Sequence, residues 1–208
     1  DLVLVGGGHT HALALRALAM KPVRGLRMTL ISPAPFTPYS GMLPGLLAGH
    51  YSFEETHIDL VRLCQWAGVR FHADTVVGLD PVARRLHCAS RGDVPYDILS
   101  LDIGSQPELD SVPGAREFAV PVKPVAKLWS RWQRLAGGGQ LAGQRVAVVG
   151  GGAGSVEVAL AIAHRLRDEA PAVTLYCGSR KLLEGYAAGA RRVVGRQLQA
   201  LGIELATD

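Results

Sequence analysis

Two glycine-rich turns of the same design constrain this chain more than any other feature. The first spans residues 6–11 (GGGHTH), and the second spans residues 150–155 (GGGAGS). Each turn follows a short apolar run and leads into an Ala/Leu/Val-rich stretch of helical character. In a strand-turn-helix of this kind, the glycines let the backbone approach a pyrophosphate, and the helix N-terminus offers free N–H groups to the anion. Two such turns predict two dinucleotide sites and electron transfer between the two ligands.

The composition is that of a globular protein that buries a core. Hydrophobic residues make up 48% and charged residues 19% of the 208 residues, enough for one large domain or two small ones. The net charge is +4, and the densest basic cluster is Arg191, Arg192 and Arg196. These arginines recur at helical spacing without interleaved aromatic residues, so we interpret them as a solvated helix face and expect no nucleic-acid partner.

The cysteines and the apolar runs exclude several other classes of protein. Cys64, Cys88 and Cys177 form no C-x-x-C pair, which argues against a disulfide-stapled secreted fold, a structural zinc site and a redox dithiol. No apolar run approaches the roughly 18–20 residues that cross a bilayer. We therefore expect a cytoplasmic location and no metal. Because the first residue is Asp1 rather than Met, we also expect that the natural start has been trimmed.

The remaining sequence alternates between expected strands and expected helices. Hydrophobic spacing predicts helices over residues 12–20, 53–67, 125–135 (stopped by glycines 137–139) and 190–201, besides the helix after the second turn. Expected strands cover residues 27–31, 69–71, 75–79, 85–88, 96–101, 173–176 and 203–205. Residues 75–79 and 85–88 are expected to form a hairpin-like pair around Asp80-Pro81. The Pro-rich segment 32–49 predicts an irregular loop, and segment 107–124 predicts the boundary between domains. We expect an α/β fold of Rossmann-like, three-layer domains with parallel sheets: residues 1–112 and an incomplete second domain, 113–208.

Five further segments give the sequence a family resemblance. Downstream of the first turn comes YDILSLDIGS (residues 96–105), and Val156-Glu157 follows the second turn. This order resembles the pyridine nucleotide-disulfide oxidoreductases, two-dinucleotide flavoproteins, and within them the branch similar to type II NADH dehydrogenases. The segments 29–33 (TLISP), 39–45 (YSGMLPG) and 49–52 (GHYS) resemble more narrowly the oxidoreductase part fused ahead of selenide, water dikinase.

The resemblance implies FAD in the first domain and NADH or NADPH in the second. The first turn would hold the FAD pyrophosphate, Val76 would meet the adenine, and residues 40–42 would lie by the isoalloxazine. The residues assigned to FAD are Gly6, Gly7, Gly8, His9, His11, Ser32, Pro33, Ser40, Gly41, Met42, Val76, Asp102, Ile103 and Gly104. Those assigned to the nicotinamide cofactor are Gly150, Gly152, Ala153, Glu157 and Cys177.

Several positions depart from the family pattern. His11 stands at the third glycine position, so we expect its side chain to point out or to push the helix away from the strand. Ser32 and Cys177 stand where acids would hold a ribose, and a single hydroxyl cannot grip two hydroxyls as a carboxylate does. Nearby Arg180 alone does not establish a 2′-phosphate site. We therefore expect at best a weak preference between NADH and NADPH.

Simpler roles compete with several of these assignments. His9 and His11 lack a third ligand for a metal. Glu157 has an alternative role in favouring the helix dipole. Trp129 and Trp132, three residues apart, fit packing better than flavin stacking.

These observations together predict an FAD-dependent NAD(P)H oxidoreductase that passes electrons to a small-molecule acceptor. By analogy the acceptor is a quinone or a selenium-linked compound, and the sequence identifies no catalytic side chain. The alternative is a non-catalytic nucleotide-binding module, which the missing acids favour. A homo-oligomer stays open, as does a peripheral membrane contact through a C-terminal part beyond this sequence. Since the second domain stops just as a strand begins, we expect the 208 residues alone to be a poor enzyme.

Overall fold

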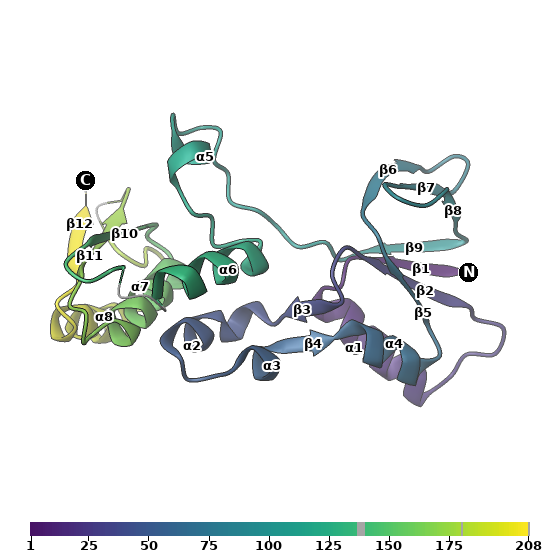
Figure 1. Cartoon of the computed structure of the whole chain (residues 1–208), viewed down its shortest axis with the longest axis horizontal. Helices are drawn as coiled ribbons and strands as arrows, with labels where there is room; N and C mark the ends of the chain where they lie inside the picture. Colours follow the sequence, from purple (N-terminus) through teal and green to yellow (C-terminus); the bar gives the residue numbers. More distant parts are fainter. Residues whose placement is uncertain (137–139, 180, 208) are drawn as a thin grey trace. The chain divides into compact units, whose positions relative to one another are not determined.

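The chain divides into two compact units in a computed structural model that describes residues 1–136, 140–179 and 181–207 (Figure 1). The first unit comprises Asp1–Tyr39 and His57–Glu108. The second comprises Ser40–Thr56 and Leu109–Asp208. Residues 40–56 therefore leave the first unit and pack with the C-terminal half of the chain, although they lie early in the sequence.

A four-stranded parallel sheet of order β5-β2-β1-β9 forms the centre of the first unit. Its strands are β1 (Leu2–Val5), β2 (Met28–Ser32), β5 (Arg70–Ala73) and β9 (Ile98–Leu101). Successive side chains of a strand point to opposite faces. Leu4 packs on one face with Leu15 of α1 (His9–Met20) and Leu60 of α4 (Leu60–Ala67). The apolar run of β1 is thus buried on both sides, as a central parallel strand requires.

The opposite face of this sheet is covered by a small antiparallel sheet. It consists of β6 (Val76–Asp80), β7 (Arg85–Cys88) and β8 (Val94–Pro95). Leu86 of β7 is fully buried against Val3 and Val5 of β1. The expected pairing of residues 75–79 with residues 85–88 is confirmed.

The second unit is built on a three-stranded parallel sheet of order β10-β11-β12. Its strands are β10 (Arg145–Val149), β11 (Ala172–Cys177) and β12 (Glu204–Thr207), and its longer helices are α6 (Val125–Ala136), α7 (Ala153–Arg165) and α8 (Ala188–Ala200). Val148, Leu175 and Ala159 join one core cluster with Leu43 and Leu47, which come from residues 40–56. Helix α7 thereby packs on its own sheet and on the early segment. Helix α5 (Ala115–Phe118) belongs to the same unit.

The expectation that residues 32–49 form an irregular loop is wrong. They contain β3 (Phe36–Pro38), a 3₁₀ turn (Ser40–Met42) and α2 (Leu43–Ala48). Pro44 does not prevent α2, because it lies in the first turn, where the N–H that proline lacks would have no helical partner. The buried side chains of Leu43, Leu46 and Leu47 give the short helix its stabilising face.

The expected single helix over residues 53–67 is also wrong. Helix α3 (Phe53–Thr56) ends at a short strand, β4 (His57–Asp59), which pairs antiparallel with β3, and α4 begins after it. Asp59 caps α4, because its carboxylate accepts the N–H of Arg62 at 2.9 Å. Because Asp59 caps a helix, a new helix begins at this point within the segment for which the hydrophobic spacing predicted one continuous helix.

The apolar stripe expected on α8 is only partly buried. Leu198 is buried, whereas Val193 is 49% and Leu201 39% exposed. The expected helix stop at residues 137–139 lies outside the described residues.

Candidate nucleotide-binding turns

The first turn joins β1 to α1 through a backbone conformation that only glycine adopts without strain. Gly6 has φ +92°, and its N–H donates to the carbonyl of Ile31 at 2.8 Å. A Cβ at Gly6 would overlap the backbone carbonyl of Asp102. Gly8 is the N-cap of α1. The first N–H groups of the helix therefore emerge from the turn without helical partners, as an anion site requires.

His11 fills the third glycine position with a buried ring. Its side chain is 2% exposed, its Nδ1 lies 2.8 Å from the Gly6 carbonyl oxygen, and its Nε2 lies 2.8 Å from the hydroxyl of Ser100 in β9. A carbonyl oxygen only accepts, so Nδ1 carries a proton, and in the neutral ring Nε2 accepts from Ser100. The expectation that His11 points out is wrong. The ring turns inward and ties the turn to the neighbouring strand.

Asp102 closes the space beside Gly8. It follows β9, its N–H donates to the Val5 carbonyl at 2.8 Å, and its own carbonyl accepts the Gly8 N–H at 3.2 Å. Its carboxylate Oδ2 accepts the backbone N–H of His11 at 3.1 Å. A Cβ at Gly8 would collide with this carboxyl group. The absence of a side chain at Gly8 therefore makes room for Asp102, a role that the motif alone does not reveal.

Ser32 lies beside the middle glycine of the turn. It is buried at the end of β2, and its hydroxyl donates to the Ala34 carbonyl at 3.1 Å. The same hydroxyl lies 3.3 Å from where a Cβ of Gly7 would stand, and the Leu60 side chain lies closer still. Pro33, which follows Ser32, is exposed. The position expected to hold a ribose thus presents one hydroxyl at the edge of the turn.

His9 is exposed at the start of α1 and stacks on Tyr39. The ring centroids are 4.6 Å apart and the planes are inclined by 28°. Because both residues belong to the first unit, this stack forms an aromatic edge to the turn.

The other residues assigned to FAD lie farther along the chain. Val76 begins β6, Ile103 is 73% exposed, and Gly104 has φ +74°. The structure places Val76, Ile103 and Gly104 in the first unit with the turn. Ser40, Gly41 and Met42 form the 3₁₀ turn of the second unit.

Asp74 orders the loop that precedes β6. Its buried carboxylate accepts backbone N–H groups from Thr75 (2.8 Å), Ser90 (3.1 Å) and Arg91 (3.1 Å). Burial by itself would raise the pKa of this carboxyl, but the three N–H donors and the Arg91 guanidinium outweigh it and lower the pKa. Asp74 was not among the residues predicted from the sequence. The only signal was an acid directly after a strand of the parallel sheet.

The second turn repeats the first in register. Gly150 has φ +140°, and its N–H donates to the Tyr176 carbonyl at 2.8 Å. Ser155, at the third glycine position, places its hydroxyl 2.7 Å from the Gly150 carbonyl and 2.8 Å from that of Gly152. Gly152 is the N-cap of α7, in extended conformation, and a Cβ there would meet no described atom within 4 Å. The N-terminus of α7 is therefore sterically open.

Cys177 stands beside the middle glycine of the second turn. Its Sγ would lie 2.5 Å from a Cβ of Gly151, and it is 3.3 Å from the hydroxyl of Ser179. Ala153 is the first residue of α7, and Glu157 is exposed one turn later. Arg180, weighed as a partner for a 2′-phosphate, lies outside the described residues.

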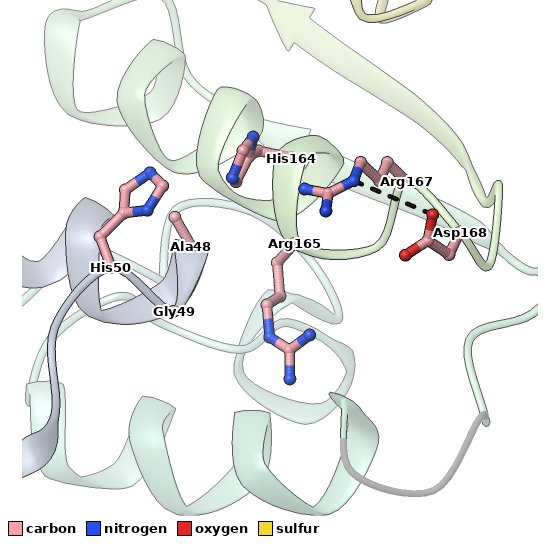
Figure 2. Close-up of a pocket in the computed structure, with 7 residues that line it drawn as sticks. All are labelled: Ala48, Gly49, His50, His164, Arg165, Arg167 and Asp168. Carbon is pink, nitrogen blue, oxygen red and sulfur yellow. Dashed lines mark ion pairs between the residues drawn. The ribbon is translucent and has the colours of Figure 1, made fainter.

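A basic pocket lies at the other end of α7. Figure 2 shows the rings of His50 and His164, whose centroids are 4.8 Å apart, and the ion pair between Arg167 and Asp168 (3.9 Å); Arg165 also lines the pocket. A helix of 13 residues is roughly 20 Å long, so this pocket is remote from the glycine turn. Cationic side chains at a helix C-terminus offset its negative dipole end, which accounts for the cluster without a ligand.

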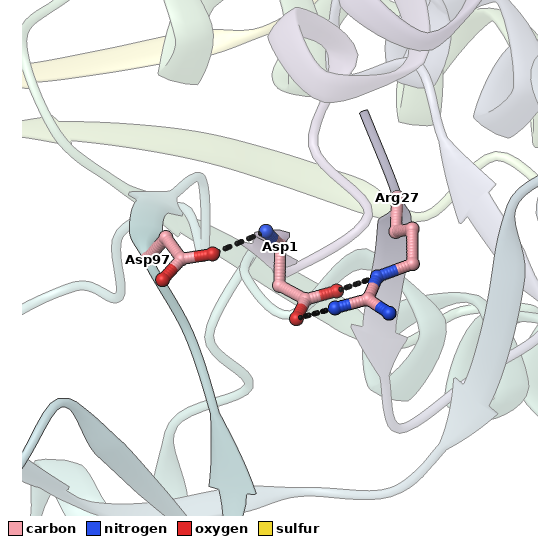
Figure 3. Close-up of polar contacts among 3 residues, drawn as sticks. All are labelled: Asp1, Arg27 and Asp97. Atoms are coloured by element: carbon pink, nitrogen blue, oxygen red, sulfur yellow. Dashed lines mark hydrogen bonds and ion pairs between the residues drawn. The ribbon is translucent and has the colours of Figure 1, made fainter. Parts of the chain in front are cut away.

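A second polar cluster lies at the start of β1, away from the glycine turn. Arg27 donates to both carboxylate oxygens of Asp1 at 2.8 and 2.7 Å (Figure 3), and the backbone N–H of Asp97 donates to the Asp1 carbonyl at 2.9 Å. These contacts tie β1 to its neighbouring segments.

The described residues contain no group of three or more His, Cys, Asp or Glu side chains that could hold a metal ion. Within the same residues, no helix is long and apolar enough to cross a membrane.

The family of the chain follows from its whole length. A family model described as pyridine nucleotide-disulphide oxidoreductase matches residues 1–208. The chain belongs to this family. The resemblance inferred from the two turns and the YDILSLDIGS segment is confirmed at the level of the superfamily.

Curated relatives share the family but extend well beyond the chain. The chain is 26% identical over 167 residues to the NADH dehydrogenase-like protein YutJ of Bacillus subtilis, which covers 76% of the chain and 43% of YutJ. It is 28% identical over 183 residues to the alternative NAD(P)H-ubiquinone oxidoreductase C1 of Arabidopsis thaliana, covering 78% of the chain and 35% of that protein. The chain thus spans less than half the length of these relatives.

Solved structures of this family share the fold. NDH2 of Plasmodium falciparum, in complex with NADH, superimposes with a TM-score of 0.85 at 17% identity, over 99% of the chain and 47% of NDH2. The sulfide:quinone oxidoreductase of Aquifex aeolicus gives 0.75 at 21% identity, over 99% of the chain and 50% of that protein. The expected α/β class with Rossmann-like parallel sheets is confirmed.

Proposed function

We propose that this chain forms the nucleotide-binding part of an FAD-dependent oxidoreductase that takes hydride from NADH or NADPH. The observation that carries the proposal is the pair of strand-turn-helix units in matching register. In each turn the first glycine, Gly6 or Gly150, has positive φ and donates its N–H to the neighbouring strand. The glycine two residues later, Gly8 or Gly152, is the N-cap of the helix. The relatives named as NADH and NAD(P)H dehydrogenases support it.

In this proposal the first turn binds the diphosphate of FAD. The helix N-terminus and the glycine backbone fit a diphosphate, and bound FAD would supply the hydride acceptor. Gly6 shapes the turn, and Val76 and Gly104 lie in the same unit, where the adenine and the flavin nucleotide are expected to contact the chain. The negative charge of the Asp102 carboxylate opposes the ligand.

The second turn binds the diphosphate of the nicotinamide cofactor in the same proposal. The open space at Gly152 is what a diphosphate needs for close approach to the backbone. Glu157 is exposed one turn into α7, in position to contact the nicotinamide end of the cofactor. The functional domains we propose remain residues 1–112 for FAD and 113–208 for NAD(P)H.

The electron acceptor we propose is a small molecule, a quinone or a selenium-linked compound by analogy. The relatives support an acceptor of some kind but differ in it: one is named as a ubiquinone oxidoreductase, and another as a probable ferredoxin reductase of Castellaniella defragrans. We place the protein in the cytoplasm, which its three free cysteines support.

Absorbance spectroscopy of the full-length natural protein tests the proposal. We expect a bound flavin whose absorbance bleaches when NADH is added without oxygen. The sharpest variant is Gly152→Val, because the open, extended backbone there accepts a side chain without a clash. This variant should keep its flavin and its fold but bleach at least tenfold more slowly at low NADH concentration.

Each other outcome of this experiment contradicts part of the proposal. If the purified protein binds no flavin, the first site is wrong. If flavin binds but neither NADH nor NADPH bleaches it, the chain is a non-catalytic nucleotide-binding module, which Ser32 and Cys177 favour. Unchanged bleaching in Gly152→Val would remove the second turn from the cofactor site.

A further inference from the structure

We propose that Asp102 is an internal competitor of the FAD diphosphate. Its carboxylate occupies the N-terminus of α1 in the flavin-free protein and weakens flavin binding until it is displaced. This inference rests on the proposed function of the first turn. It assigns to Asp102 a control over cofactor loading rather than a supporting contact with the flavin.

The geometry places the Asp102 carboxylate where a ligand anion would seek its donors. Oδ2 accepts the N–H of His11, which belongs to the first turn of α1, at 3.1 Å. The carboxyl group also fills the space that the missing side chain of Gly8 leaves. In nucleotide turns of this design that space lets the phosphate approach the backbone.

The backbone of Asp102 holds this carboxylate close to the turn. Its N–H bonds to Val5 at 2.8 Å, and its carbonyl accepts from Gly8 at 3.2 Å. Because two hydrogen bonds fix the backbone of Asp102, its short side chain reaches the helix end at little cost in side-chain conformational entropy. The carboxylate is therefore a preorganised cap for α1, which has no capping side chain of its own at Gly8.

A carboxylate and a diphosphate at one helix end exclude each other for two reasons. Both only accept hydrogen bonds, so they compete for the same few N–H donors. Both are anions, and the half positive charge of the helix end cannot neutralise both. The hydrogen-bond donor to the Asp102 carboxylate among the described residues carries no charge: His11 gives its backbone N–H, and its ring bonds to Gly6 and Ser100.

Affinity measurements on the full-length natural protein freed of flavin test this competition. Asp102→Asn keeps the size of the side chain and an acceptor oxygen for the His11 N–H, but removes the charge. We expect it to bind FAD about tenfold more tightly than the wild type. Tenfold corresponds to about 1.4 kcal/mol, within the range for an anion at a helix N-terminus. Asp93→Asn, an exposed acid of the same unit, is the control and should stay within twofold.

ADP separates the diphosphate from the flavin. Because ADP carries a diphosphate and no isoalloxazine, it should gain affinity in Asp102→Asn as FAD does. A gain for FAD without a gain for ADP, or no gain for FAD, overturns the inference while leaving the proposed function intact. Failure of both the wild type and Asp102→Asn to bind either ligand overturns the proposed function itself.

A structure of the wild-type protein with FAD gives an answer that does not depend on the variant. We expect the Asp102 carboxylate to have left the His11 N–H, to beyond hydrogen-bond distance. If Oδ2 still accepts that N–H with FAD bound, the two anions coexist and the inference is wrong.

Discussion

The two glycine turns of this chain differ in what stands beside the glycine at the helix N-cap, Gly8 in the first turn and Gly152 in the second. In both, the third position bonds back to the first glycine's carbonyl, through the ring of His11 in one and the hydroxyl of Ser155 in the other. Yet the space at Gly8 is filled by a carboxylate, whereas the space at Gly152 is open among the described residues. Among the described residues, a carboxylate therefore caps the helix end at Gly8, and no side chain stands at Gly152.

The carboxylate beside Gly8 is supplied from the end of a neighbouring strand. In the first unit β1 lies between β2 and β9, and Asp102 follows β9 directly. In the described part of the second unit β10 pairs with β11 alone. What stands beside the first turn therefore depends on a strand about 90 residues later in the sequence as much as on the turn itself.

The sharpest test of this comparison is an alanine at each N-cap glycine, Gly8 and Gly152. Gly8→Ala should lower the free energy of unfolding by about 3 kcal/mol, because its Cβ forces the Asp102 carboxyl away from the helix end. Gly152→Ala should change it by no more than about 0.5 kcal/mol. Chemical denaturation of both variants measures the two values.

A double-mutant cycle assigns the Gly8 effect to its cause. In the Asp102→Ala background, Gly8→Ala should cost at least about 1 kcal/mol less than in the wild type, since the group it displaces has gone. Additive effects would mean that the turn rejects a side chain at Gly8 for another reason. The explanation by Asp102 would then fail.

The third position of each turn gives the next largest effect. His11→Ala should cost about 2 kcal/mol, because the buried Gly6 carbonyl and Ser100 hydroxyl each lose a partner. Ser155→Ala should cost about 1 kcal/mol or less, since its hydroxyl is only partly buried. Thermal unfolding of both variants checks the order. His11→Gly restores the family's small residue, and if it stabilised the protein, His11 would be a packing defect rather than a tie.

A titration tests a buried thiol of the first unit. Cys64 is 1% exposed, and burial raises its pKa to about 11. The unfolded thiol ionises near pH 9, so between pH 9 and 11 the unfolded chain loses its proton first, and stability falls as the pH rises. At pH 10 this loss is about 1 kcal/mol. Cys64→Ala should lose that much less stability than the wild type between pH 8 and 10, and equal losses would show that the thiol does not titrate as burial implies.

The sequence predicted those elements whose signal is local. The apolar runs before each turn and the paired segments 75–79 and 85–88 are confirmed, because alternation, turn residues and spacing suffice for them. Helix α2 and the break before α4 were missed. A proline in a first turn and an aspartate that caps a new helix both depend on where the helix begins, which spacing leaves uncertain by several residues.

The two glycine turns could be predicted from the sequence, but the side chains that surround them could not. Glycines 6, 8, 150 and 152 follow from the motif. The inward ring of His11 and the carboxylate of Asp102 depend on pairing with β9, a contact across about 90 residues that no local pattern encodes. Asp74 was missed for the same reason, since its partners Ser90 and Arg91 lie in a loop formed by later strands.

The last comparison concerns the residues beside the middle glycines, Ser32 beside Gly7 and Cys177 beside Gly151. We propose that Cys177 stands at the position where an acid would grip the ribose of the nicotinamide cofactor; its thiol neither repels a 2′-phosphate as a carboxylate does nor attracts one. We therefore predict a preference between NADH and NADPH below about 100-fold, or about 2.7 kcal/mol. Flavin reduction rates with the two donors at equal concentration measure it.

Cys177→Asp should move the preference toward NADH, whereas Ser32→Asp in the first unit should leave it unchanged, because that turn is proposed to hold FAD. If the wild type already discriminates more than 100-fold, a charged residue other than Cys177 selects the donor, and the likeness between the two turns ends at their ribose positions.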